Sequence, residues 1–185
     1  MRPIVLMVPG LWDSGPEHWQ SRWEADEPTW CRVQQENWDR PRCPEWVQTL
    51  DEAVQSAGVP VVIAAHSLGC VAVGHWARRG RRIQGALLVA PADVEAPSCP
   101  DGPEGFAPIP LAPLPFPSIV VASSDDPYVS LPRARFFADA WGSAFVEMGP
   151  LGHINAESGI GRWEKGRRLL SSLLDTPLSS RAGPG

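Results

Sequence analysis

The sequence predicts a single-domain α/β protein with a mostly parallel central sheet and helices on both faces of that sheet. Three observations lead to this fold class. The chain has 185 residues, a length that suits one domain. Several short runs are apolar at almost every position, which indicates strands buried on both faces. Segments with helical spacing alternate with these runs, and such alternation is typical of parallel strands joined by helical crossovers.

The expected strands are short apolar runs bounded by proline, glycine or polar residues. They cover residues 3–8, 59–65, 85–90, 118–123 and 144–148, with a weaker candidate at residues 31–35. The expected helices cover residues 16–25, 44–57, 68–79, 131–141 and 162–174. Because each helix lies between two strands or after the last one, the pattern predicts that helices cover both faces of the sheet.

Tryptophan marks the inner faces of several expected helices. Trp46 and Leu50 lie on one face of the helix at residues 44–57, and Pro44 stands near its start, where proline is tolerated. The tryptophans at helical spacings are expected in the core. These are Trp19, Trp23, Trp46 and Trp141.

Two segments depart from this alternation. Residues 91–117 contain nine prolines and almost no helical pattern. Since proline fixes φ and removes a hydrogen-bond donor, this segment predicts an ordered loop and not a helix. Residues 175–185 are small and polar with proline and glycine, and they predict a flexible tail. We therefore expect one domain over residues 1–174.

The composition argues against several classes of partner. The net charge is −5 and no basic stripe exists, so a nucleic-acid partner is not expected. The apolar run at residues 4–9 is too short for a secretory or membrane-spanning segment, which predicts a cytoplasmic protein with no membrane partner. The four cysteines form no C-x-x-C pair, so we expect free thiols and no metal site. No cofactor is expected.

The strongest local signal surrounds Ser67. The run Ala64-Ala65-His66-Ser67-Leu68-Gly69 stands where an expected strand passes directly into an expected helix. A nucleophile elbow needs such a tight turn, with small residues two before and two after the serine, and Ala65 and Gly69 meet that demand. The turn would expose the Ser67 hydroxyl and aim the Leu68 N–H at a bound carbonyl oxygen. An ordinary strand–turn–helix with serine as the cap is the alternative.

A second signal follows the first expected strand, in Val8-Pro9-Gly10-Leu11-Trp12. Gly10 allows the backbone to approach a substrate closely. The loop would supply the second donor of an oxyanion hole from the N–H of Leu11 or Trp12, and we favour Leu11. Trp12 is also a candidate for the wall of an apolar acyl pocket.

Position along the chain selects one of four histidines as the base. His66 adjoins Ser67, so its side chain leaves the backbone on a different side. His75 lies about 12 Å away along the helix at ~1.5 Å per residue. His18 suits a packing or capping role. His153 follows the last expected strand, at the rim where ligands bind in open α/β sheets.

The acid is expected after the penultimate strand, where Asp125 and Asp126 compete. Pro127 biases Asp126 toward an extended conformation and fixes the turn that follows. We choose Asp126, with Asp125 as the fallback, and a structural turn cap is the alternative for either. The chain order Ser67, Asp126, His153 is that of a strand–turn–helix hydrolase triad.

The sequence resembles the small serine-hydrolase family of the α/β-hydrolase superfamily that includes retinoblastoma-binding protein nine and the YdeN-like bacterial esterases. The resemblance rests on the Ser67 motif and on three narrower blocks. These blocks lie at residues 108–118, 123–128 and 152–163. The resemblance implies a compact α/β-hydrolase fold without a helical lid, and a triad that maps onto Ser67, Asp126 and His153.

The expected activity is serine hydrolysis of small acyl esters through an acyl-enzyme, with a small-molecule substrate. Without a lid the site is expected to be shallow, which favours short acyl groups. A thioesterase or aminopeptidase would use the same triad. A non-catalytic interaction protein on the same fold is the rival from another class. The sequence does not indicate an oligomeric state.

Overall fold

The computed structural model describes residues 2–176, and the expected tail lies mostly outside these described residues. Over that range six strands form one sheet in the order β2-β1-β3-β4-β5-β6, with every neighbouring pair parallel. The strands are β1 Ile4–Val8, β2 Cys31–Arg32, β3 Val61–His66, β4 Gly85–Val89, β5 Ser118–Ala122 and β6 Ala144–Glu147. The predicted parallel sheet is thereby confirmed.

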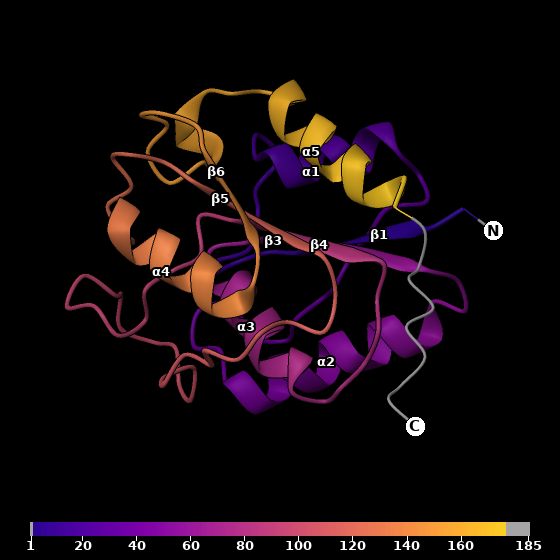
Figure 1. The fold of residues 1–185 in the computed structure, drawn as a ribbon, viewed down its shortest axis with the longest axis horizontal. Coiled ribbons are helices and arrows are strands. Elements are labelled where there is room, and N and C mark those ends of the chain that lie inside the picture. Colours follow the sequence, from indigo (N-terminus) through magenta and orange to yellow (C-terminus); the bar gives the residue numbers. More distant parts are fainter. Residues whose placement is uncertain (1, 177–185) are drawn as a thin grey trace.

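Helices cover both faces of this sheet, also as predicted (Figure 1). Helices α1 and α5 lie on one face, and α2, α3 and α4 lie on the other. The bounds are α1 Trp19–Asp26, α2 Cys43–Ser56, α3 Leu68–Ala77, α4 Leu131–Trp141 and α5 Glu164–Leu174, with a short 3-10 helix η1 at Ala156–Ser158.

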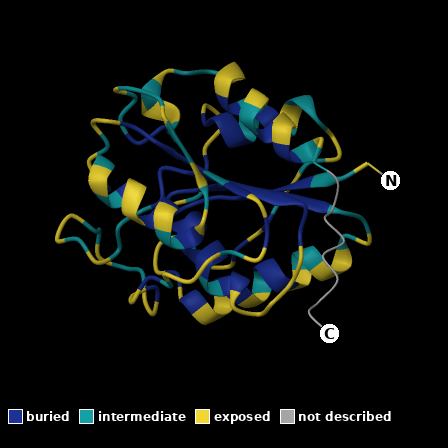
Figure 2. Cartoon of the chain, viewed as in Figure 1, coloured by how far each residue is buried: buried dark blue, intermediate teal, exposed yellow. Residues whose placement is uncertain are grey.

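Alternate residues of the strands supply two hydrophobic cores. In β3, for example, Ile63 joins the core beneath α2, α3 and α4, whereas Val62 and Ala64 join the core beneath α1 and α5. Figure 2 shows the buried strands between the two helical layers. The four tryptophans expected in the core are buried there. They are Trp19, Trp23, Trp46 and Trp141.

Some element ends differ from the expected ones for local reasons. Helix α1 begins at Trp19 and not at residue 16, because His18 is its N-cap. Strand β2 spans two residues where five were expected, and it pairs only with Leu6 and Met7 of β1 at the sheet edge. Helix α5 begins two residues late because Trp163, directly before it, has φ +46°.

The strand order creates a crevice at the carboxyl ends of β1 and β3. The chain crosses from β1 to β2 on one side and then returns to place β3 on the other side of β1. At such a switch point the loops leave the sheet in opposite directions, and ligands bind in the opening between them. The residues after β1 and β3 are Pro9 and Ser67, so both sequence signals lie at this opening.

The proline-rich segment between β4 and β5 is an ordered loop, as predicted. It contains no helix and only an isolated bridge between Glu104 and Arg42. Trp141 at the end of α4 donates from Nε1 to Pro110 O at 2.7 Å, and its carbonyl accepts from Leu114 N at 2.9 Å. These bonds tie the second half of the loop to α4.

Candidate active site

Ser67 lies on a strained turn between β3 and α3. Its φ and ψ are 53° and −120°, a positive φ that non-glycine residues rarely adopt. The turn is fixed by neighbours: the Ser67 N–H donates to Val89 O at 2.9 Å, and a Cβ at Gly69 would lie 2.6 Å from Pro9 O. Only glycine at position 69 therefore lets α3 begin so close to the end of β1. The turn holds the Ser67 hydroxyl above the carboxyl edge of the sheet.

The loop after β1 lies directly against this turn. A Cβ at Gly10 would stand 2.8 Å from the Ser67 Cβ and 3.2 Å from Leu68 N, so this close approach requires glycine. The Trp12 N–H donates to Trp38 O at 3.0 Å. Within residues 2–176, the N–H groups of Leu11 and Leu68 donate to no protein acceptor. Two backbone donors thus remain beside Ser67, and of the two alternatives in the loop, Trp12 is already engaged.

His153 stands between Ser67 and Asp126. Its Nε2 lies 2.8 Å from Ser67 Oγ, and its Nδ1 lies 2.9 Å from both carboxylate oxygens of Asp126. The Asp126 side chain is fully buried, and its Oδ1 also accepts from the Tyr128 N–H at 2.9 Å. Three side chains from the segments that follow β3, β5 and β6 therefore form one continuous hydrogen-bonded chain.

Asp125, the fallback acid, makes different contacts. Its Oδ1 accepts from Ser123 Oγ at 2.7 Å and from the Gly152 N–H at 2.8 Å. Those two hydrogen bonds hold the pKa of the Asp125 carboxyl below its usual range. Ser123 Oγ in turn accepts from the Leu151 N–H at 2.9 Å. Asp125 thus ties the β5 loop to the loop that carries His153, and it does not contact the imidazole.

The other histidines have separate partners. His75 Nε2 lies 2.8 Å from Phe106 O, outside the pocket that contains Ser67. His18 caps α1, as expected, by accepting from the Gln20 N–H at its Nδ1. Its neutral ring therefore carries the proton on Nε2, which is buried and has no hydrogen-bond partner among residues 2–176.

His66 does leave the backbone on a different side from Ser67, yet it reaches the same site. Its Nε2 lies 2.8 Å from the carbonyl oxygen of His153, and the two rings are 4.8 Å apart. Sequence reasoning missed this contact because it considered only whether His66 reaches Ser67. Alternation along β3 puts His66 on the α1 side of the sheet, and the loop after β6 folds across that side.

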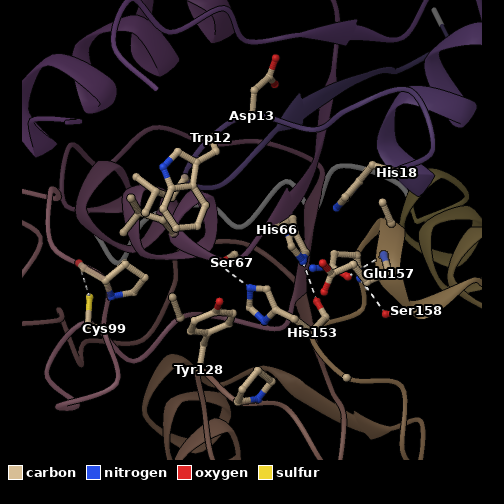
Figure 3. A pocket seen from close by; sticks show the side chains of 18 of the residues that line it. Trp12, Asp13, His18, His66, Ser67, Cys99, Tyr128, His153, Glu157 and Ser158 are labelled. Atoms are coloured by element: carbon tan, nitrogen blue, oxygen red, sulfur yellow. Dashed lines mark hydrogen bonds between the residues drawn. The ribbon is translucent and has the colours of Figure 1, made fainter. Parts of the chain in front are cut away.

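Ser67 and His153 open into a pocket of about 590 Å³. In the view of Figure 3, Trp12, Cys99 and Tyr128 lie on one side of Ser67, and His18, His66 and Glu157 lie on the other. Trp12 is 58% exposed, so it forms part of the rim as well as the wall. Cys99 and its neighbours come from the proline-rich loop, whose position relative to Ser67 no sequence signal indicates. The charged side chains that line the pocket are acidic: Asp13, Asp93 and Glu157.

Two absences concern only the part of the chain that the structure describes. Between residues 2 and 176, no group of three or more histidine, cysteine or acidic residues is arranged to hold a metal ion. In the same range, none of the helices combines the length and the apolar character needed to span a membrane.

A parallel sheet with helices on both faces and a serine on a strained turn after a central strand defines an α/β-hydrolase. The chain belongs to the serine hydrolase family, which it matches over residues 5–172. No curated protein matches it in sequence.

Solved structures give the same picture of the fold. A YdeN-like hydrolase from Pectobacterium atrosepticum is 36% identical with a TM-score of 0.84, over 96% of this chain and 94% of that one. The ydeN gene product from B. subtilis is 18% identical with a TM-score of 0.71, over 92% and 98%. A monoacylglycerol lipase from Paleococcus ferrophilus is 13% identical with a TM-score of 0.71, over 95% and 96%. The last two show a shared fold only.

Proposed function

We propose that this serine hydrolase cleaves small acyl esters through a covalent acyl-enzyme on Ser67. The observation that carries the proposal is the unbroken chain from Ser67 Oγ through His153 to Asp126, at 2.8 Å and 2.9 Å. A serine hydroxyl is a weak nucleophile until a base within hydrogen-bond reach takes its proton. Here the base, its orienting acid and the strained serine are all present at one end of the sheet.

The reaction begins with attack by Ser67 Oγ on the ester carbonyl carbon. His153 Nε2 accepts the hydroxyl proton as the Oγ–C bond forms, and Asp126 stabilises the resulting imidazolium at Nδ1. His153 then gives that proton to the leaving alkoxide as the C–O bond breaks. The imidazole then takes a proton from a water molecule as the water oxygen attacks the acyl carbon. The bond from that carbon to Ser67 Oγ breaks, His153 returns the proton to Oγ, and the carboxylic acid leaves.

The backbone around Ser67 supports the negative charge that develops on the carbonyl oxygen. The N–H groups of Leu11 and Leu68 form the oxyanion hole in this proposal, because neither has an acceptor among the described residues 2–176 and Gly10 brings the first loop against the elbow. Helix α3 begins at Leu68, so the positive end of its helix dipole also faces the carbonyl oxygen in this proposal.

The pocket favours small, uncharged acyl groups. It is bordered by a proline-rich loop without a helical lid, and Trp12 and Tyr128 offer apolar surface next to Ser67. Of the acidic residues that line it, Asp13 and Asp93 are paired with Arg32 and Arg133, and Glu157 adds a negative charge that disfavours an anionic substrate. A thioesterase or an aminopeptidase would use the same groups. We also propose that residues 1–174 form one domain that contains the whole site.

Ester turnover by the purified protein tests this proposal. We expect p-nitrophenyl acetate and butyrate to be hydrolysed faster than the palmitate ester, because the loop that borders the pocket has no helical lid to bury a long acyl chain. We expect Ser67→Ala to abolish turnover, because no other nucleophile occupies the end of the His153 hydrogen bond. Wild-type rates in purified Ser67→Ala would refute the assignment. Faster cleavage of palmitate would refute the substrate class.

A further inference from the structure

The residue directly before the nucleophile contacts the backbone of the base. His66 Nε2 lies 2.8 Å from the carbonyl oxygen of His153, and the two residues are 87 positions apart in the sequence. A carbonyl oxygen only accepts, so the His66 Nε2–H donates. His66 is 5% exposed and His153 is 9% exposed, so this hydrogen bond lies in a protected environment.

The surroundings of His66 keep its ring neutral and in one tautomer. The His18 ring is 4.7 Å away, the Trp19 ring 6.2 Å, and the His153 ring 4.8 Å. Burial, with contributions from His18 and His153, lowers the pKa of His66 well below its ordinary value. In the neutral ring the single proton is on Nε2, where the His153 carbonyl accepts it.

Around His153, residues 151–154 are held to other elements by side chains and not by a strand ladder. Ser123 Oγ accepts from the Leu151 N–H and Asp125 Oδ1 accepts from the Gly152 N–H, at 2.9 Å and 2.8 Å. Trp19 Nε1 donates to Ile154 O at 2.9 Å. His66 supplies the corresponding bond at position 153 itself. Gly152 and Ile154, on either side of His153, both have positive φ, so this backbone needs such external support.

We propose that His66 is a positioning residue for the base: its imidazole holds the His153 backbone where the side chain can contact both Ser67 and Asp126. This inference rests on the proposed function. The two side-chain bonds of His153 orient the ring, whereas the His66 bond fixes the main chain from which the ring projects. A displacement of about 1 Å at a reacting group is enough to lower a rate by about 10²-fold.

Substitutions of His66 that change the reach of its N–H donor, or remove the donor, test this role. His66→Gln keeps an N–H that can extend to the His153 carbonyl, His66→Asn keeps an amide one methylene too short, and His66→Leu removes the donor. His75→Leu is the matched control, because His75 Nε2 makes the same kind of bond to Phe106 O at 2.8 Å away from the pocket. For each variant kcat and KM on p-nitrophenyl acetate are measured, with the rate of inactivation by a fluorophosphonate and the urea midpoint.

We expect His66→Leu and His66→Asn to lower kcat by about 10- to 100-fold with little change in KM. The fluorophosphonate rate falls by a similar factor, because that reaction needs activation of Ser67 but no ester binding. His66→Gln recovers most of both rates. His75→Leu lowers the urea midpoint and leaves both rates near those of the wild type.

The outcomes separate the two proposals. An active wild-type protein whose kcat and fluorophosphonate rate are unchanged in His66→Leu contradicts the positioning role alone, as does a His66→Gln variant no faster than His66→Asn. The Gln and Asn pair decides the matter if His66→Leu fails to fold. A wild-type protein that neither turns over esters nor reacts with the fluorophosphonate contradicts the proposed function, and the positioning role with it.

Discussion

Two adjacent aspartates after β5 have different partners, which separates their roles. Both Asp126 oxygens lie 2.9 Å from His153 Nδ1, and the side chain is fully buried. Asp125 is exposed and accepts from Ser123 Oγ and the Gly152 N–H. Sequence reasoning favoured Asp126 because of Pro127 and left Asp125 as the fallback. The contacts support the same choice, and the catalytic role stays a proposal.

Replacement of each aspartate by asparagine distinguishes these roles. We expect Asp126→Asn to lower kcat by about 10⁴-fold, by analogy with the serine-protease triad, because the amide no longer selects the tautomer of His153 with a basic Nε2. Asp125→Asn keeps an oxygen that accepts from Gly152 N, so its loss is expected to be far smaller. Steady-state kinetics on p-nitrophenyl acetate measure both. Equal losses in the two variants would contradict the assignment of Asp126.

At the scale of secondary-structure elements, the start of α1 links fold stability to a buried titratable group. His18 accepts from the Gln20 N–H at its Nδ1 and is 4% exposed. Burial, followed by the charges of Arg32 and His153, lowers the pKa of His18 from 6.5 to about 3. In the folded state His18 is therefore neutral, and its Nδ1 can accept the hydrogen bond from the Gln20 N–H.

His18→Ala and His18→Asn separate the cap from the titration. At pH 7 we expect His18→Ala to lower the free energy of unfolding by about 1 kcal/mol, whereas asparagine is itself a good N-cap and retains most of it. Below pH 6.5 the unfolded chain protonates His18 and the folded chain does not until about pH 3. His18 thus makes the wild type less stable as the pH is lowered through this window, because the unfolded state binds more protons than the folded state.

Asparagine at position 18 removes that protonation and retains the cap. We therefore expect the stability difference between the wild type and His18→Asn to shift in favour of the variant between pH 7 and pH 5, as measured by urea unfolding at each pH. A difference that stays constant across this range would show that His18 titrates alike in both states. A His18→Ala variant as stable as the wild type at pH 7 would contradict the capping role.

At the scale of the whole molecule, sequence pattern predicted the parallel sheet and its two helical layers. Apolar runs such as those of β3 and β4 are buried on both faces, so their composition carries the information directly. The sequence predicts the first residue of strand β2 correctly, but the strand is shorter than predicted, because its length depends on pairing at the edge of β1. Pairing partners and strand order are long-range properties that local pattern does not encode.

The candidate site likewise contains residues that the sequence predicts and contacts that it does not. Ser67 stands in a local motif, and chain order singled out His153, so sequence alone nominated the residues that the structure brings within hydrogen-bond distance. The contact from His66 to the His153 carbonyl depends on how one loop folds over the sheet. The same is true of Cys99 and its neighbours at the pocket wall, which come from a loop whose prolines predict order but no position.

The central claim is that distant parts of the chain converge to make one hydroxyl reactive, and locating a covalent adduct tests it most directly. Wild-type protein is treated with a fluorophosphonate, digested, and mapped by mass spectrometry of its peptides. We expect a single phosphonylated peptide with the adduct on Ser67, and no adduct in Ser67→Ala or after unfolding in urea. A folded, pure protein that takes up no label, or that takes it up at another serine, would contradict the account.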